Sequence, residues 1–162
     1  MKAVVQRVRK ACVSVDGTIT GKINNGLLVY LGVSVNDSEK DVLWLVDKVS
    51  NLRIFGDADG KMNLSIIDIL AQGLEAGVLA ISQFTLLGNC VKGRRPYYGE
   101  AADPKIAEPL YLFFIKKIRE CNIACETGIF QAHMEVDSVN DGPVTILLDS
   151  SVAVEKPVIQ KN

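Results

Sequence analysis

A short apolar segment interrupted by polar side chains constrains this chain more than any other stretch. Residues 78–87 read Val-Leu-Ala-Ile-Ser-Gln-Phe-Thr-Leu-Leu, and their length and apolarity predict one buried β-strand. Ser82, Gln83 and Thr85 fall inside that strand, where each polar group loses water and must find a partner. Such groups either bond to neighbouring backbone at a strand end or point into a functional site. On its own, the segment favours the first explanation.

The composition indicates one globular domain without a global signal for nucleic-acid binding. The chain has 162 residues, 48% of them apolar and 23% charged, and its formal net charge is −1. A chain of this size buries a sizeable core. We expect a single domain over residues 1–150 and a loosely ordered tail over residues 151–162. Because the charge is nearly balanced, any RNA contact must come from a local basic patch.

Neither export nor a metal site is expected. No apolar run reaches the roughly 20 residues that a membrane helix needs, and the first residues lack the layout of a signal peptide. The cysteines include no Cys-x-x-Cys pair, so we interpret them as reduced thiols of a cytoplasmic protein. His133 is the only histidine, which argues against zinc. The four cysteines are Cys12, Cys90, Cys121 and Cys125.

Alternating apolar residues predict strands in the first part of the chain. Residues 11–15 alternate, Asp16-Gly17 is a hairpin signal, and residues 18–23 form the returning strand. Residues 27–33 continue this pattern, so we expect an antiparallel meander. Further strands are expected at residues 52–55, at residues 131–136 and after Pro143.

Two amphipathic helices are expected between these strands. Ser38 and Asp41 form a capping-box pattern before apolar residues at helical spacing. Asp103-Pro104 begins a second helix, in which Pro109 should cause a kink or a delayed start. Residues 65–77 fit a helical turn or a strand. The pattern predicts an α+β fold, with a largely antiparallel sheet curled into a partly closed barrel and two packed amphipathic helices.

A second polar stretch changes the interpretation of the first. Residues 140–145 read Asn-Asp-Gly-Pro-Val-Thr, which is typical of a turn before a strand. Together with Ser-Gln-Phe-Thr-Leu at residues 82–86, this motif resembles the paired signature of the D-aminoacyl-tRNA deacylases. The resemblance extends from residue 1 to about residue 148. Further matches are Val5-Gln6-Arg7-Val8, Lys92-Gly93-Arg94-Arg95-Pro96, and Gly128-Ile129-Phe130 with Met134.

The resemblance implies hydrolysis of the ester that joins a D-amino acid to the ribose of tRNA. Glycine mischarged on alanine tRNA is a further implied substrate, and L-aminoacyl-tRNA is rejected. The implied enzyme is a homodimer with its active sites at the interface, and no metal or organic cofactor is implied. In the family, the Gly-Pro peptide of the second motif is cis and obstructs the L-side chain in the partner's pocket.

The resemblance also assigns roles to individual residues. Ser82, Gln83, Phe84 and Thr85 match the catalytic motif, and Gly142-Pro143 matches the chirality filter. Three residues match supporting positions, of which the first holds the Gly-Pro turn and the second walls a pocket for the terminal adenosine. These three are Arg7, Phe130 and Met134.

The chemistry leaves more than one mechanism open. An aminoacyl ester is already activated, so the enzyme need only position water and stabilise an oxyanion, for which backbone N–H groups around Phe84 and Thr85 are suitable. A Thr85 or Ser82 nucleophile would need an adjacent base, and the sequence places none beside them. We therefore expect substrate-assisted hydrolysis by the ribose hydroxyl. A different esterase using these hydroxyls and a non-catalytic tRNA- or protein-binding module remain alternatives.

One basic segment stands out after the first motif. Lys92, Arg94 and Arg95 lie close to Tyr97 and Tyr98, the only cluster of basic and aromatic residues in the chain. The segment is either a solvated loop or a contact for tRNA phosphates. His133, which has polar neighbours on its own strand face, is expected at the surface or an interface and outside the mechanism.

Overall fold

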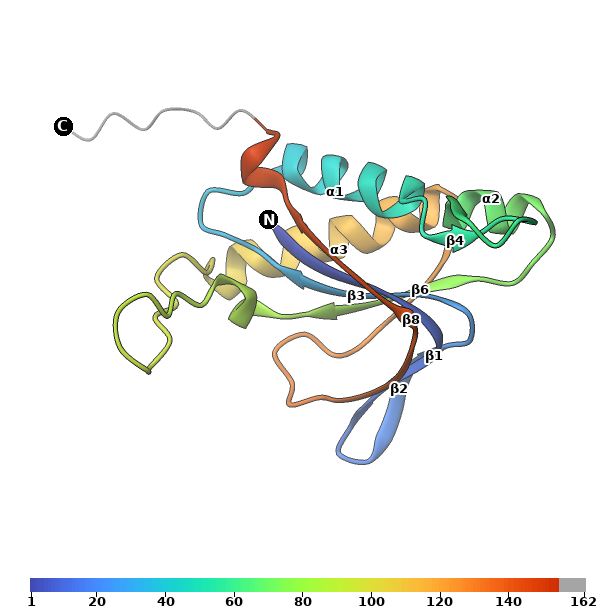
Figure 1. The fold of residues 1–162 in the computed structure, drawn as a ribbon. Coiled ribbons are helices and arrows are strands. Elements are labelled where there is room, and N and C mark those ends of the chain that lie inside the picture. Colours follow the sequence, from blue (N-terminus) through green and yellow to red (C-terminus); the bar gives the residue numbers. More distant parts are fainter. Residues whose placement is uncertain (155–162) are drawn as a thin grey trace.

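The computed structural model describes residues 1–154 as a curled sheet with helices packed on one face (Figure 1). Most of the expected C-terminal tail, residues 155–162, lies outside the described residues. The elements in chain order are β1 (Lys2–Val15), β2 (Thr18–Ile23), β3 (Gly26–Gly32), α1 (Glu39–Asn51), β4 (Phe55–Gly56), β5 (Met62–Leu64), α2 (Ile66–Ala71), β6 (Gly77–Ser82), the 3-10 helix η1 (Phe84–Leu87), α3 (Pro104–Glu120), β7 (Ala124–Thr127), β8 (Glu135–Asp149) and the 3-10 helix η2 (Ser150–Val152).

Strand β1 organises the sheet because it pairs along both edges. Its second half pairs antiparallel with β2 across the Asp16-Gly17 turn, and its first half pairs antiparallel with β3. Strand β8 runs antiparallel along the opposite edge over almost the whole length of β1. The predicted hairpin is confirmed, but the predicted meander is wrong: β3 pairs with β1, since β1 is long enough to hold β2 and β3 end to end.

Two parallel pairings complete the sheet. Strand β6 pairs parallel with β3, with Leu31 opposite Ser82, and β7 pairs parallel with β6. Parallel neighbours need crossover connections, which the segments containing α1 and α3 provide. All other pairings among the described strands are antiparallel. The α+β prediction of a largely antiparallel, partly closed sheet is therefore confirmed.

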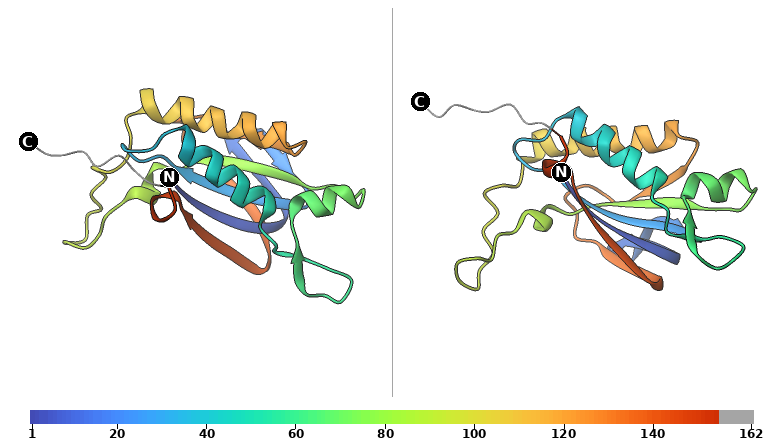
Figure 2. Two further views of the ribbon diagram at one scale, coloured as in Figure 1. Left: turned by 90° about the horizontal axis from the view of Figure 1, so that it is seen from above. Right: turned by 45° about the horizontal axis from the view of Figure 1, so that its top comes forward.

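Helices α1 and α3 lie side by side over one face of the sheet (Figure 2). The Asp41 carboxylate accepts a hydrogen bond from the Ser38 N–H at 2.9 Å, and Asp103 accepts one from the Lys105 N–H at 2.9 Å. Because the Asp103 cap fixes the first turn, α3 begins at Pro104. Of the two effects expected from Pro109, a kink or a delayed start, the delayed start is therefore wrong. No helix within residues 1–154 has the length and apolarity to cross a membrane.

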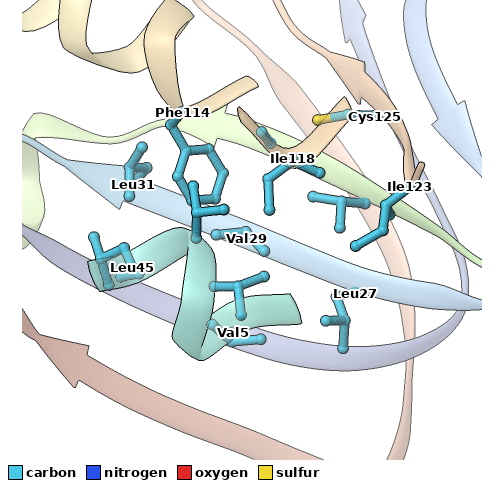
Figure 3. Close-up of a cluster of buried hydrophobic side chains, with 14 of the residues drawn as sticks. Val5, Leu27, Val29, Leu31, Leu45, Phe114, Ile118, Ile123 and Cys125 are labelled. Atoms are coloured by element: carbon cyan, nitrogen blue, oxygen red, sulfur yellow. The ribbon is translucent and has the colours of Figure 1, made fainter. Parts of the chain in front are cut away.

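Two apolar clusters lie on the two faces of β3. Between the sheet and the helices, Leu27 and Val29 pack with Phe114 and Ile118 (Figure 3). Leu28 points to the other face, inside the curl of the sheet, and belongs to a second cluster. Alternate residues of a strand point to opposite faces, so β3 is buried on both. The second cluster comprises Val8, Ala11, Val13, Ile23, Leu28, Leu79 and Ile81.

Two predicted strands have other bounds in the structure, and one ambiguous segment proves to be helical. The strand expected at residues 52–55 is reduced to β4, because Leu52 still caps α1. The strand expected at residues 131–136 begins only at Glu135, because Gln131 has a positive φ of 64° in a turn. The ambiguous residues 65–77 contain helix α2, which Ser65 caps.

Candidate active site

The first signature motif lies where β6 ends. The strand stops at Ser82 and the chain turns into η1, so the prediction of one strand over residues 78–87 is wrong in its second half. The neighbouring strand β3 ends at Gly32, which leaves residues 84–87 without a pairing partner. Backbone groups need partners, and the chain satisfies its own in a 3-10 turn, with the Leu86 N–H donating to Gln83 O and the Gly88 N–H to Thr85 O.

This turn leaves two backbone donors available. The N–H groups of Phe84 and Thr85 open η1, where a helix has no internal acceptor for them. Within residues 1–154, no backbone or side-chain acceptor bonds to either group. The Gln83 N–H, by contrast, donates to Leu31 O at 2.8 Å and anchors the turn to β3. The pair can therefore stabilise a developing oxyanion.

The side chains of the first motif supply hydroxyl and amide groups but no basic group that could activate a hydroxyl. The Gln83 side-chain amide donates to the Thr85 hydroxyl at 2.5 Å. A carboxamide cannot take a proton from a hydroxyl in either orientation, so this contact does not activate Thr85 as a nucleophile. The Ser82 hydroxyl has no hydrogen-bond partner in the described part of the chain, and Thr85 is exposed.

A cavity of about 570 Å³ opens beside the motif. Its wall includes Ser82, Gln83 and Phe84, whereas Thr85 is not part of it. The cavity lies where the two apolar clusters meet, since Leu31 from the first and Ile81 from the second both line it. Its volume is typical of small-molecule sites.

Tyr111 of α3 forms part of the cavity wall. Its hydroxyl donates to Ala80 O at 2.8 Å, and its ring lies 5.8 Å from that of Phe130 between centroids. Burial raises the pKa of the Tyr111 phenol, so the hydroxyl stays protonated. The sequence interpretation missed Tyr111, although the i, i+3, i+4, i+7 spacing of Tyr111, Phe114, Ile115 and Ile118 could have identified this buried stripe.

The segment between β7 and β8 closes the cavity on another side. Phe130, His133 and Met134 all line it, and Phe130 is half-buried. A Cβ added at Gly128 would lie 2.4 Å from the Met134 sulfur, so the glycine makes room for that side chain. His133 is exposed, as expected, but it lies on the cavity wall.

The second motif forms a bulge inside β8. Asn140 pairs with Val8 and Thr145 with Gln6, so residues 141–144 lie opposite Arg7 alone. The turn expected at residues 140–142 is therefore a bulge within a continuous strand, with β8 on both sides of it. The Gly142-Pro143 peptide is cis, as the resemblance implies, and both residues are exposed.

Polar contacts hold this bulge from both sides. The Arg7 Nε lies 3.0 Å from Asp141 Oδ2, and the Arg7 guanidinium also donates to Ile54 O. The Asn140 side-chain amide donates to Arg7 O and to Val144 O, each at 3.0 Å, and so spans the bulge. Asp141 also pairs with Arg9, at 3.1 Å.

The two motifs do not meet within one chain. Arg7, beneath the bulge, pairs with Leu27, whereas Ser82 pairs with Leu31. Those two positions are four residues apart along β3, which corresponds to roughly 13 Å at the usual rise of a strand. Gly142 and Pro143 accordingly do not line the cavity of their own chain.

The basic segment is an exposed loop beside the motif. Lys92, Arg94 and Arg95 are exposed, and none of the ion pairs between described residues involves them. Asn89 and Tyr97 exchange backbone hydrogen bonds of 2.8 and 2.9 Å at the neck of this loop.

Comparisons with known proteins identify relatives of this chain over most of its length. The family model described as D-Tyr-tRNA(Tyr) deacylase matches residues 4–149. The D-aminoacyl-tRNA deacylase of Thermosipho africanus is 54% identical over 150 residues, 93% of this chain and 97% of the relative. The enzyme of Halothermothrix orenii is 54% identical over 151 residues, 93% of this chain and 98% of the relative.

Solved structures with the same fold include two informative neighbours. The "c-Myc DNA Unwinding Element Binding Protein" has a TM-score of 0.84 and 39% identity, and the match covers 93% of this chain and 99% of that one. A probable eukaryotic D-amino acid tRNA deacylase has a TM-score of 0.76 over 91% of this chain and 97% of that one. At 16% identity, this second likeness shows the fold alone.

Together the comparisons define the class of protein: a hydrolase that acts on aminoacyl-tRNA. The chain belongs to the D-aminoacyl-tRNA deacylase family, and the resemblance of its two motifs to that family is confirmed.

Proposed function

We propose that this enzyme performs chiral proofreading, hydrolysing D-aminoacyl-tRNA and excluding L-aminoacyl-tRNA. The observation that carries the proposal is the pair of unoccupied backbone donors, the N–H groups of Phe84 and Thr85, on the turn that borders the cavity. Two such donors aimed at a carbonyl oxygen stabilise the tetrahedral oxyanion of ester hydrolysis. We include glycine mischarged on alanine tRNA among the substrates, because glycine has no side chain for a chirality filter to obstruct.

The attack on the ester is assisted by the substrate. The Thr85 hydroxyl bonds to the Gln83 amide and the Ser82 hydroxyl has no partner in residues 1–154, so neither has a base to activate it. An aminoacyl ester needs little activation, and the free ribose hydroxyl beside it can orient the attacking water. Ser82, Gln83 and Thr85 then act by shaping and hydrogen-bonding the site. A covalent route through Thr85 is the second candidate.

Exclusion of L-substrates requires recognition at the α-carbon, since many D-side chains must be accepted. Backbone carbonyls suit this task because they can bind the α-amino group whatever side chain is attached. A Cβ added at Gly142 would lie 2.7 Å from Val144 Cγ2, at a φ of 129°, so the position favours glycine and brings bare backbone close to a ligand. In this proposal Gly142 and Pro143 obstruct the L-side chain.

The filter operates between two copies of the chain. The bulge and the turn over residues 82–85, which we call the catalytic turn, are separated along β3 in one chain, so Gly142-Pro143 must enter the cavity of a partner. Strand β8 supports this arrangement: among the described strands it pairs only with β1, and Leu147 on it is 77% exposed. A free strand edge with an exposed apolar side chain is a surface suited to pairing with another copy.

Substrate binding extends beyond the cavity. Lys92, Arg94 and Arg95 are exposed cations in a chain whose formal net charge is −1, and we assign them to tRNA phosphates. Phe130 and Met134, on the cavity wall, bound the space for the terminal adenosine. The proposed location is the cytoplasm, where aminoacyl-tRNA is used and where free thiols persist.

A deacylation assay tests the proposal. Matched samples of one tRNA charged with the D- or the L-form of the same amino acid are incubated with the enzyme, and release of amino acid is measured over time. We expect release from the D-form only, with uncharged tRNA as the binding control. Equal release from both forms would refute chiral selection, and binding of charged tRNA without release would identify a binding module.

A further inference from the structure

An exposed pair of aromatic rings lies at the edge of the cavity, and the hydrolytic step does not use the rings themselves. The rings of Phe84 and Tyr98 meet edge to face, with centroids 5.1 Å apart and an interplanar angle of 65°. Phe84 is 59% exposed and Tyr98 is 36% exposed. Two aromatic side chains in contact, each with free surface, form a ready platform for another flat ring.

The loop holds Tyr98 in this position through its backbone. The reciprocal bonds between Asn89 and Tyr97 close the neck of the loop one residue before Tyr98. A Cβ added at Gly88 would lie 3.0 Å from Tyr98 Cε1, so the ring packs directly against the glycine backbone. Gly88 also donates its N–H to Thr85 O. The ring of Tyr98 is therefore attached to the catalytic turn as well as to the basic loop.

The charges around the rings indicate what the platform binds. Lys92, Arg94 and Arg95 project from the same loop and are unpaired within the described chain. Cations that track phosphates, combined with aromatic rings that stack on bases, are the usual combination for single-stranded RNA. The carboxylates of an acidic peptide would pair with the cations alone, whereas a nucleotide strand uses the cations and the rings together.

We propose that Tyr98 and Phe84 form a stacking subsite for the unpaired nucleotide that precedes the terminal adenosine of tRNA. The inference rests on the proposed function and deepens it. Phe84 lines the cavity and touches Tyr98, so the two rings offer a continuous surface for a strand whose last nucleoside occupies the cavity. The phosphates of the same strand then pass toward the cationic loop.

A fluorescent base tests the subsite directly. Uncharged tRNA carrying 2-aminopurine in place of the penultimate nucleotide is titrated with wild-type protein and with Tyr98→Leu, Tyr98→Phe and Tyr97→Leu variants. Stacking on a ring quenches 2-aminopurine, so wild type and Tyr98→Phe should quench it, and Tyr98→Leu should lose most of the effect. Tyr97→Leu is the matched control, since Tyr97 is 70% exposed in the same loop and has no ring contact with Phe84.

Kinetics provide the second readout. We expect Tyr98→Leu to raise KM for D-aminoacyl-tRNA about tenfold, the scale on which removal of one stacking ring acts. The increase should be several-fold smaller for D-aminoacyl-adenosine, which lacks the penultimate nucleotide. Equal effects on both substrates, or undiminished quenching by Tyr98→Leu, would overturn the subsite. Quenching by a wild-type protein that releases no amino acid would support the subsite and refute the proposed function.

Discussion

Thr85 is the residue on which the choice of mechanism depends. Its hydroxyl receives a hydrogen bond from the Gln83 amide and contacts no base, and its side chain does not line the cavity. Its backbone N–H, which any residue would supply, has no acceptor within residues 1–154 and is the group that we propose stabilises an oxyanion. In this proposal the side chain and the main chain of one residue have separate roles.

The first prediction follows from this separation. Thr85→Ala should retain kcat within about tenfold of the wild-type value, because loss of a true nucleophile costs on the order of 10⁶-fold in a serine protease. Thr85→Ser should bring no gain over Thr85→Ala. Single-turnover deacylation of D-aminoacyl-tRNA measures both. An acyl-Thr85 adduct detected by mass spectrometry of the quenched reaction would contradict substrate assistance.

A second residue-scale prediction concerns stability. Tyr111→Phe removes the hydroxyl that donates to Ala80 O, and the loss of one such buried bond should lower the free energy of unfolding by about 1 kcal/mol. Urea denaturation measures the change as a lower midpoint with an unchanged slope. Tyr97→Phe is the control, because that hydroxyl is on an exposed ring. Equal midpoints for Tyr111→Phe and wild type would show that the bond adds nothing.

At the scale of secondary-structure elements, β8 combines regular pairing with a local irregularity. The ladder with β1 is interrupted only at residues 141–144 and near Lys10. Asn140 and Arg7 hold the interruption in place, Asn140 by two hydrogen bonds across it and Arg7 by an ion pair with Asp141. Bulges of this kind commonly aim a group at a functional site.

The third prediction tests whether the Asn140 hydrogen bonds hold the bulge in the orientation that chiral selection needs. Asn140→Ala removes both hydrogen bonds across the bulge, so the Gly142-Pro143 peptide should lose its fixed orientation. We expect the ratio of D- to L-aminoacyl-tRNA deacylation to fall at least tenfold, with a decrease of about 1–3 kcal/mol in the free energy of unfolding. Asn51→Ala serves as the control, because that exposed amide only bonds back to Asp47 within α1. Unchanged selectivity would show that the Asn140 hydrogen bonds are not needed for the exclusion of L-aminoacyl-tRNA.

At the scale of the whole molecule, the two halves of the site lie on different parts of one chain. The cavity lies at the Leu31 end of β3 and the Gly-Pro bulge at the Leu27 end. In the proposed function a complete site requires a second copy, and the exposed face of β8 is the surface through which we expect the copies to associate.

The fourth prediction concerns that association. Leu147→Asp places a charge on the exposed face of β8, where burial in an interface would carry a large desolvation cost. We expect a shift from dimer to monomer, measured by sedimentation, together with loss of deacylation. Ile19→Asp is the matched control, because Ile19 is 59% exposed on β2. A fully active, D-selective monomer would contradict the shared site.

The fifth prediction concerns long-range electrostatics. Replacing Lys92, Arg94 and Arg95 by alanine should weaken tRNA binding, because each of these cations is expected to neutralise a phosphate. The salt dependence of log K should decrease by about one unit of slope for each phosphate that is no longer neutralised. Binding is measured over a series of salt concentrations. A slope equal to that of the wild-type protein would assign the loop to structure alone.

Features that depend on neighbouring residues in the chain were determined by the sequence itself. The caps at Ser38 and Asp103 and the Asp16-Gly17 hairpin follow from local bonding, and each is present in the structure. The two signature motifs likewise indicated the family, because each is a short continuous stretch of sequence. The residues that we propose form the catalytic turn, Ser82 to Thr85, were singled out in this way, and their role stays a prediction.

Tertiary structure decided the features that depend on where strands distant in the sequence begin and end. Residues 84–87 leave the sheet because β3 stops at Gly32, and β3 pairs with β1 because β1 is long enough to hold two partners. The contact of Tyr111 with Ala80 O and its place on the cavity wall depend on the surface against which α3 packs. The distance between the catalytic turn and Gly142-Pro143 also depends on strand register, which arises from the packing of the whole sheet and not from any one stretch of sequence.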